Sequence, residues 1–235
     1  MITYYIGREG PVHWELNRKT HILSFEGEGA LPDFHPFHEN LPSWMPLKEQ
    51  VHEVHMGEGI THIGDYAFYP YDYGVFSKMR SRLHRIVFPF SLESIGKFAF
   101  RANNRLQYID LRGHSELRSI EEYAFASCFQ AKGVDLSGCE RLGYIDRHAF
   151  WACDELSYIN LERCFSLSVD ILQSLRNEIP LHIPIIMPNG KVWCDESSFL
   201  SPNYKECRIY LKGTRLQDSC PYGPYTKDER NSTPA

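Results

Sequence analysis

A segment near the middle of the chain occurs four times, and this repeat limits the possible folds more than any other feature of the sequence. Each copy has an aliphatic residue, two variable residues, Ile, three variable residues and then Ala-Phe. The copies end at Phe68, Phe100, Phe125 and Phe150, with steps of 32, 25 and 25 residues. Self-similarity in a fixed register predicts equivalent structural units that stack on one another.

A second repeated element lies between these copies, at residues 83–88, 106–111, 131–136 and 156–161, with an earlier copy at 51–56. Its last two apolar positions are two residues apart, which is the period of a half-buried strand. One such unit cannot bury its own apolar side, whereas stacked units share a continuous core. We therefore expect parallel strands about 4.8 Å apart and a file of phenylalanines that fills the space between coils.

The combined pattern, L-x-x-I-x-L followed by L-x-x-I-G-x-x-A-F-x-x-C, resembles the BspA-type leucine-rich repeat, also called the Treponema pallidum type. The resemblance covers roughly residues 12–165. The segments 14–16, 23–29 and 31–34, followed by Trp44, resemble the lead-in to such repeats in bacterial surface proteins, many from Bacteroides-like organisms.

The resemblance implies a strand-rich α/β solenoid with a parallel β-sheet on one face, short helical or irregular turns on the other, and caps at both ends. It also implies adhesion or attachment to host proteins at a bacterial surface. Two positions depart from the pattern, because Tyr71 and Asn103 replace the Cys after Ala-Phe. The first interval has seven extra residues around Tyr71–Phe76, which we expect to form an aromatic surface loop and a candidate contact site.

The predicted organisation has four parts. Residues 1–47 form a β-hairpin cap and a Pro-rich connector, extended over 31–47, and residues 48–166 form the repeats. Residues 167–216 form a second cap, with a helix at 168–178, strands at 183–187 and 192–194, and a possible last strand at 208–212. Residues 217–235 are polar and are expected to be loosely ordered.

Charge and hydropathy narrow the classes of function. The net charge is −5 and the isoelectric point is about 6.1, which argues against sequence-independent nucleic-acid binding and against polybasic attachment to membranes. The apolar stretches are too short for an integral membrane segment. The amino terminus does not read as a secretory signal. We therefore expect the cell surface or secretion if a signal has been removed, and the cytoplasm otherwise.

The cysteines fall into two repeated offsets. Cys128 and Cys153 are 25 residues apart, as are Cys139 and Cys164. Equivalent residues in neighbouring coils have parallel Cα–Cβ vectors, so we predict buried free thiols rather than disulfides. The remaining cysteines are each thirteen residues apart: Cys194, Cys207 and Cys220. They keep open an alternative, a metal-binding protein or enzyme that uses its Cys-rich carboxyl region.

The outward side of the strand row provides the candidate binding site. Side chains that flank each buried Ile or Val point away from the core, and Arg112 and Glu162 extend the strip. The candidate residues are Glu53, His55, Arg85, Tyr108, Asp110, Asp135, Tyr158 and Asn160. Asp110, Asp135 and Asn160 are predicted to form one column, and Tyr108 and Tyr158 belong to the next.

The strip predicts a non-catalytic protein that binds a protein partner, since Tyr and Arg commonly anchor interfaces. No nucleophile constellation or phosphate-binding glycine loop is present, and no cofactor or metal site is expected. His52 and His55 are three residues apart, so they lie on opposite faces of a strand and cannot chelate together. The alternatives are an intracellular scaffold and a solvated face without a partner.

Overall fold

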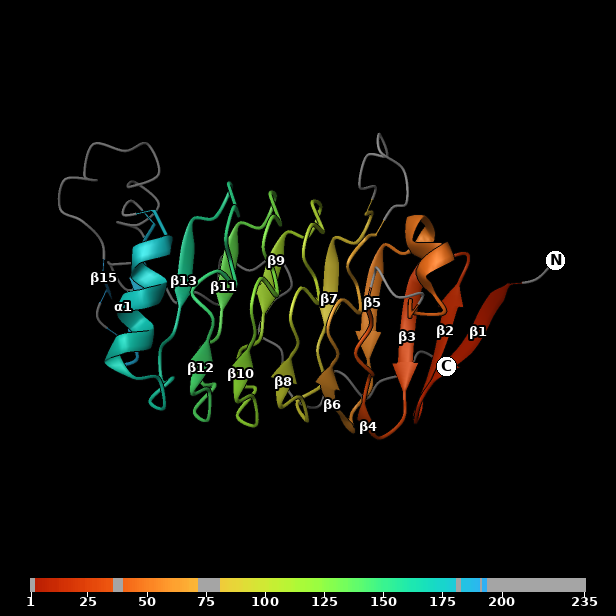
Figure 1. Cartoon of the computed structure of the whole chain (residues 1–235), viewed down its shortest axis with the longest axis horizontal. Helices are drawn as coiled ribbons and strands as arrows, with labels where there is room; N and C mark the ends of the chain where they lie inside the picture. The colour runs from red at the N-terminus through yellow and green to blue at the C-terminus, as the bar shows by residue number, and fades with distance from the viewer. Residues whose placement is uncertain (1–2, 36–39, 72–80, 181–182, 191, 194–235) are drawn as a thin grey trace.

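A long row of ten strands runs along one side of the computed structural model, which describes residues 3–35, 40–71, 81–180, 183–190 and 192–193 (Figure 1). Its first sheet has the order β1-β2-β3-β5-β7, and its second sheet runs β9-β11-β13-β14-β15. The two sheets adjoin at β7 and β9, where the Gln107 N–H donates to the His84 carbonyl oxygen at 3.3 Å. The strands are β1 (Tyr4–Glu9), β2 (Val12–Asn17), β3 (Ile22–Glu26), β5 (Glu53–Met56), β7 (Arg85–Val87), β9 (Tyr108–Asp110), β11 (Gly133–Asp135), β13 (Tyr158–Asn160), β14 (Ile185–Ile186) and β15 (Val192–Trp193).

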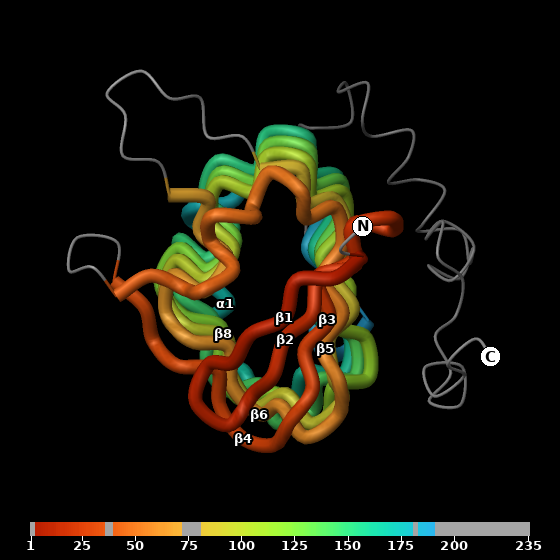
Figure 2. The backbone as a smooth tube through the Cα atoms, turned by 90° about the vertical axis from the view of Figure 1, so that its right-hand side faces the viewer, coloured from red at the N-terminus to blue at the C-terminus, as the bar shows by residue number. Residues whose placement is uncertain are grey.

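A short row of parallel strands lies on another side of the same coils, as the view along the axis shows (Figure 2). It contains β4 (Gly29–Ala30), β6 (Ile60–Ile63), β8 (Ser94–Ile95), β10 (Ser119–Ile120) and β12 (Tyr144–Ile145). The Ile-centred segment of each repeat therefore forms a second sheet, where the sequence suggested only turns. The predicted class, a strand-rich α/β solenoid of stacked coils, is confirmed.

The interior is a file of stacked phenylalanines. Ring centroids are 5.0 Å apart between Phe68 and Phe100, 5.2 Å between Phe100 and Phe125, and 5.9 Å between Phe125 and Phe150. The alanine before each of these rings is completely buried. This packing confirms the predicted roles: Ala allows the close approach of the turn, and Phe fills the space between coils.

The Ala-Phe turn depends on a residue with left-handed backbone. Tyr66, Phe98 and Tyr123 have φ values of +57°, +57° and +54°, a conformation that side chains other than glycine seldom adopt. Each turn is held by the next coil, since the Phe98 N–H donates to the Glu122 carbonyl oxygen at 2.9 Å. The rings of these residues also stack: the Phe98 centroid lies 4.8 Å from that of Tyr66 and 5.2 Å from that of Tyr123. Stacking and these hydrogen bonds offset the strain of the turn.

The amino-terminal cap is a three-stranded antiparallel unit, because β1 joins the predicted hairpin of β2 and β3. Trp14 packs edge-on against Trp44 and donates from Nε1 to Ser43 Oγ at 2.8 Å. The connector was predicted to be extended over residues 31–47. The structure differs at its end, which forms the 3-10 helix η1 (Met45–Gln50). Pro46 explains the difference, since proline fits the first turn of a helix, where its missing N–H costs nothing.

The carboxyl-terminal cap follows the prediction more closely. The helix α1 (Val169–Glu178) begins after Ser168, whose Oγ accepts from the Ile171 N–H at 3.3 Å. The strand β14 pairs in parallel with β13, and β15 pairs antiparallel with β14. The predicted second hairpin is therefore confirmed, although β14 is shorter than expected.

Several predictions fall outside the described residues. They concern residues 72–76 of the insertion, the possible strand at 208–212, the tail at 217–235, and Cys194, Cys207 and Cys220. The boundaries 1–47, 48–166, 167–216 and 217–235 stay predictions.

Candidate functional site

The register of the long row brings the predicted outward residues together in columns. Glu53 on β5 pairs with Arg85 on β7, and His55 pairs with Val87. Gly133 lies between Tyr108 and Tyr158 in one column. In the next column Asp135 lies between Asp110 and Asn160. The predicted columns are confirmed, but their members differ in exposure.

Glu53 is the centre of a partly exposed charged cluster on β5 and β7, whose side chains are 23% (Glu53), 36% (His55) and 26% (Arg85) exposed. Its Oε2 lies 2.9 Å from His55 Nε2 and accepts from Arg85 Nη1 at 3.3 Å. Its Oε1 lies 3.9 Å from His84 Nε2. Burial raises the pKa of Glu53, but the hydrogen bond from His55 and the positive charge of Arg85 outweigh it, so the pKa lies below its ordinary value of 4.5. The cluster holds a carboxylate beside a guanidinium in an ordered arrangement.

The aspartate and asparagine column serves the fold itself. The Oδ1 atoms of Asp110, Asp135 and Asn160 accept hydrogen bonds at 3.3, 3.0 and 3.0 Å, each from the backbone N–H two residues later. Asp135 is only 6% exposed and Asn160 only 2%. The expectation that these two side chains are open to a partner is wrong, because each turns back to satisfy the turn that follows its strand.

Arg112 neutralises part of this column. It donates from Nε and Nη2 to the two carboxylate oxygens of Asp110, both at 2.8 Å. Its Nε is also 3.9 Å from Asp135 Oδ2. Burial still raises the pKa of Asp135 above its ordinary value of 3.8, and the charge of Asp110 adds to the rise, against hydrogen bonds from Ser137 and the charge of Arg112.

The tyrosine column is also partly occupied by the fold. A Cβ atom on Gly133 would lie 2.4 Å from Cε1 of Tyr158, so the Tyr158 ring covers the space that glycine leaves. Tyr158 is 6% exposed, whereas Tyr108 is half-buried. The prediction that Tyr158 is exposed is wrong, since the lack of a side chain at Gly133 lets the ring lie down on the sheet.

The accessible part of the predicted strip is therefore Glu53, His55, Arg85 and Tyr108. A row of histidines adjoins this strip: His21, His52 and His84 directly precede β3, β5 and β7. This row was not identified from the sequence. The His21 and His52 rings stack at 4.3 Å, and His84 follows at 6.2 Å. Burial, with the charges of His21 and other basic neighbours, lowers the pKa of His52. The 32-residue step from His52 to His84, equal to that from Phe68 to Phe100, was the available signal.

The four described cysteines are free and buried, as predicted. Each Sγ donates to a carbonyl oxygen of the preceding coil: Cys128 to Phe100 and Cys153 to Phe125 at 3.4 Å, Cys139 to Leu111 and Cys164 to Leu136 at 3.1 Å. Burial raises the pKa of Cys153 and of Cys164 to about 12, and it also raises the pKa of Cys128 well above its ordinary value. Thiols in this state are not suited to nucleophilic catalysis.

Asn103 explains one departure from the repeat pattern. It occupies the place of the Cys after Ala-Phe, and its Nδ2 donates to the Phe68 carbonyl oxygen at 3.0 Å. Its Oδ1 accepts from Ser81 Oγ at 2.6 Å. The amide therefore takes over the hydrogen bond that the thiols make in the later coils.

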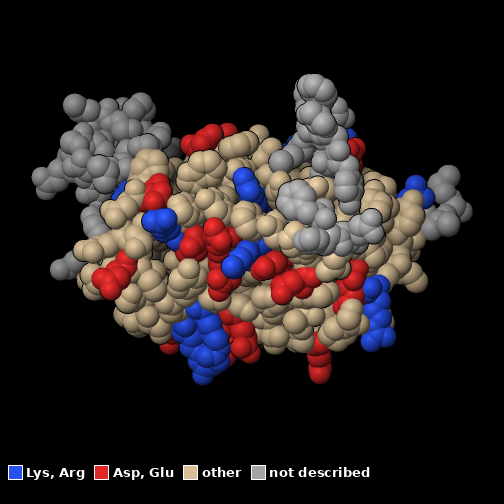
Figure 3. Space-filling view, in the orientation of Figure 1, with Lys and Arg blue, Asp and Glu red and all other residues tan. Residues whose placement is uncertain are grey.

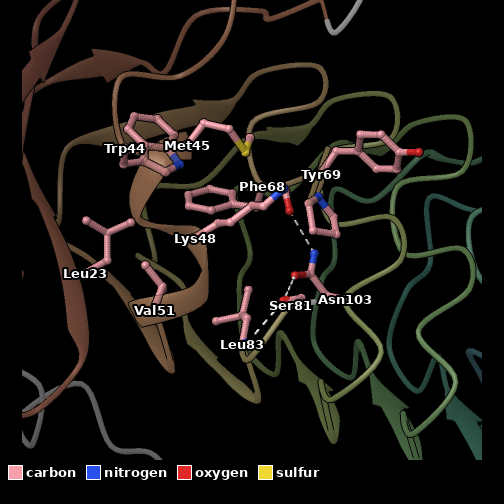
Figure 4. A pocket seen from close by; sticks show the side chains of 11 residues that line it. Leu23, Trp44, Met45, Lys48, Val51, Phe68, Tyr69, Ser81, Leu83 and Asn103 are labelled. Carbon is pink, nitrogen blue, oxygen red and sulfur yellow. Dashed lines mark hydrogen bonds between the residues drawn. The ribbon is translucent and has the colours of Figure 1, made fainter. Parts of the chain in front are cut away.

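A small apolar cavity lies between η1 and the first repeats (Figure 4). Its volume is about 30 Å³, the space of one water molecule and far below that of an ordinary ligand pocket. Lys48, one of its lining residues, donates from Nζ to the Tyr71 carbonyl oxygen. It is lined by Leu23, Trp44, Met45, Lys48, Val51, Phe68, Tyr69, Pro70, Ser81, Leu83 and Asn103.

Two features of the described residues bear on other kinds of function. Within them, no group of three or more His, Cys, Asp or Glu side chains is arranged to hold a metal ion. None of the helices in the described part of the chain has the length and apolarity needed to cross a membrane. On the face shown in Figure 3, acidic and basic side chains are interspersed over the described surface.

The repeats match the model of a known repeat family. Residues 71–175 match the model described as "BspA type Leucine rich repeat region", in six copies. Over these residues the chain has leucine-rich repeats of the BspA type, as the sequence pattern predicted. Leucine-rich repeat proteins are in general non-catalytic binding proteins. No curated protein matches the chain.

Solved bacterial leucine-rich repeat structures are similar at low identity. One from Eubacterium ventriosum is 18% identical, covers 72% of this chain and 44% of its own, and gives a TM-score of 0.47. The T. pallidum leucine-rich repeat protein is 15% identical over 72% of this chain and 95% of its own, with a TM-score of 0.26. A leucine-rich cell surface protein from Faecalibacterium prausnitzii is 15% identical over 66% of this chain and 54% of its own, at 0.29. The chain thus spans less than half of the first of these proteins, and at such TM-scores the likenesses add nothing to what the strands and repeats establish.

Proposed function

We propose that this chain is a non-catalytic module that binds a protein partner through the outward face of β5, β7 and β9. The observation that carries the proposal is the partly exposed cluster of Glu53, His55 and Arg85 next to Tyr108. Glu53 holds the His55 and Arg85 side chains in place through its two contacts. A partner therefore gains contacts with these side chains at a low entropic cost. Arginine and tyrosine are residue types that dominate binding energy at protein interfaces.

The contrast with the later strands supports this location. In β11 and β13, the outward Asp135, Asn160 and Tyr158 are nearly buried and engaged within the chain. The earlier strands keep charged groups in partial contact with solvent. We therefore place the binding surface at Glu53, His55, Arg85 and Tyr108, with Asp110 at its border.

A capture experiment with matched variants tests the proposal. The immobilised chain is exposed to protein extract, and the retained partner is quantified against Arg85→Ala plus Tyr108→Ala. The control, Arg118→Ala plus Tyr144→Ala, removes the same residue types from exposed positions associated with the short row. We expect the first double variant to lose the partner and the control to keep it. Equal retention by both folded variants would contradict the proposal, and thermal melting confirms that each is folded.

We also propose that this binding takes place at a bacterial surface, in adhesion or host interaction. The support is the family, because BspA-like leucine-rich repeat proteins are typically surface-located or secreted. Surface labelling of intact producing cells with a membrane-impermeant reagent tests this. Labelling at the level of a known surface protein is expected. Labelling only after lysis would favour the intracellular scaffold instead.

A further inference from the structure

The terminal strands of the sheets differ in how they avoid pairing with another chain. At the ends of the sheets in the described residues, β4, β12 and β15 are two residues long, and α1 packs beside β12. By contrast β1, at the amino-terminal end, is six residues long. Short or covered edges are the usual protection against edge-to-edge pairing. The edge at β1 has neither form of protection in the described part of the chain.

The hydrogen-bonding direction of β1 leaves three residues facing this edge. The Arg18 N–H donates to the Thr3 carbonyl oxygen, so Thr3 and Arg18 form a hydrogen-bonded pair. In antiparallel strands such pairs alternate along the ladder. Tyr5, Gly7 and Glu9 therefore direct their backbone groups to β2, whereas Tyr4, Ile6 and Arg8 direct theirs to the free edge.

The residues that face β2 hold the strand in place. The Arg18 guanidinium lies 5.2 Å from the Tyr5 ring centroid. The Trp14 ring fills the space over Gly7, where a Cβ would lie 2.3 Å from Trp14 Cε2. Glu9 Oε1 accepts from the Ser43 N–H at 2.6 Å. The edge is thus ordered before any partner arrives, which lowers the entropic cost of pairing.

The outward side chains of β1 are complementary to a second copy of the same strand. Ile6 is 76% exposed, the highest value among the large apolar side chains in the described residues, and Tyr4 is 45% exposed. In an antiparallel pair centred on Ile6, each Ile6 faces the other and each Tyr4 faces Arg8 of the other copy. This register sets an apolar side chain against its like and an aromatic ring against a guanidinium.

We propose that two copies of the chain associate through β1, in an antiparallel, two-fold pairing centred on Ile6. Tyr4, Ile6 and Arg8 of each copy supply the backbone groups, which gives about six hydrogen bonds across the pair. The paired edge is short compared with a standard interface, so the association is weak and concentration-dependent. This contact is separate from the proposed partner face, because β1 takes no part in the Glu53 cluster.

Sedimentation velocity over a concentration series tests the association. We expect the average mass of the chain to rise from monomer towards dimer. Ile6→Lys places two like charges opposite each other and should weaken association roughly tenfold or more. The control His13→Lys makes the same charge change at an exposed position of β2 and should associate as the unmodified chain does. A monomer at every concentration, or equal association of Ile6→Lys, would overturn the proposal.

Cysteine cross-linking tests the register. Opposed residues of a hydrogen-bonded pair have Cα atoms about 5.5 Å apart, within the range of a disulfide. With diamide as oxidant, Ile6→Cys should cross-link to itself, and a mixture of Tyr4→Cys and Arg8→Cys should give the mixed dimer. Each of these two alone should stay at the level of the unmodified chain, which controls for native thiols. Cross-linking of Tyr4→Cys alone at the level of the mixture would contradict the two-fold register.

Discussion

Coils that keep the 25-residue period and coils that depart from it use their outward residues in different ways. In β9, β11 and β13, an Asp or Asn ends each strand and accepts from the N–H two residues later. In β5 and β7, the same column holds His55 and Val87, which make no such turn. The outward carboxylate there, Glu53, binds the side chains of His55 and Arg85.

The difference shows that a polar column on a repeat surface is not in itself a recognition site. Asp135 and Asn160 have first to satisfy the turns of a regular stack, and burial follows from that. In the first coils, whose sequence is less regular, no Asp or Asn stands at the end of β5 or β7 to accept from the turn. Recognition residues are therefore expected where the repeat deviates, and structural ones where it is strict.

The largest expected effect is a loss of stability in the regular coils. Phe125→Ala removes a completely buried ring from the stacked file, and should lower the free energy of unfolding by about 3–5 kcal/mol through the cavity that remains. Denaturant unfolding measures this. The control Phe129→Ala removes a ring that is 41% exposed, and should change stability far less. A loss of similar size in the two variants would show that the file does not carry the stability of the coils.

The next effect concerns the buried turn acceptors. Asn160→Ala removes the acceptor of the Glu162 N–H and should lower the free energy of unfolding by about 0.5–1.5 kcal/mol, since the turn loses one hydrogen bond. Glu162→Ala at the neighbouring exposed position keeps that hydrogen bond and should be nearly neutral. If the two variants unfold at the same denaturant concentration, the turn does not depend on this side chain.

The smallest expected effects concern the carboxylates of Asp135 and Glu53, whose contributions to stability should depend on pH in opposite directions. The pKa of Asp135 is raised in the folded chain. Its contribution to stability is therefore greatest below 3.8, the ordinary value, and is lost as pH rises through the folded pKa. Asp135→Asn should gain stability relative to the unmodified chain over that window and keep the gain at neutral pH. A gain that does not vary with pH would contradict the assignment.

Glu53 should behave in the opposite sense. Its pKa is lowered, so its contribution is present above 4.5 and is lost as pH falls through the folded pKa. Glu53→Gln should therefore lose less than about 1 kcal/mol at neutral pH, since the cluster is partly exposed, and nothing below the folded pKa. Unfolding of both variants across pH 3–7, each against the unmodified chain, measures the two signs together. A Glu53→Gln variant that is as stable as the unmodified chain at pH 7 would show that the cluster is not ordered as described.

Much of the fold could be predicted because the repeat acts on backbone and core alike. The fixed offsets of Ala-Phe give the phenylalanine file, and the 25-residue spacing of the cysteines gives the two thiol columns. The second sheet was missed because β8, β10 and β12 are two residues long, too short for a period of two to show. The strand β1 was missed as a separate element, since its sequence alternates only weakly in hydropathy.

The site was harder to predict because the direction of a side chain does not determine its exposure. The alternation of a strand places Tyr158 and Asp135 on the outward face correctly. It does not reveal that Gly133 lets the Tyr158 ring lie on the sheet, or that Asp135 folds back to its own turn. Asx turns have a signal, an Asp or Asn at the end of each strand, which would have assigned Asp110, Asp135 and Asn160 to structure.

Hydrogen–deuterium exchange of the chain, alone and with the partner retained in the capture experiment, tests the central claim most directly. The claim is that β5, β7 and the adjoining Tyr108 of β9 recognise the partner, whereas β11 and β13 support the fold. We predict that the partner slows exchange at residues 53–55, 85–87 and 108–110 and leaves residues 133–135 and 158–160 unchanged. Protection confined to 133–135 and 158–160 would contradict it.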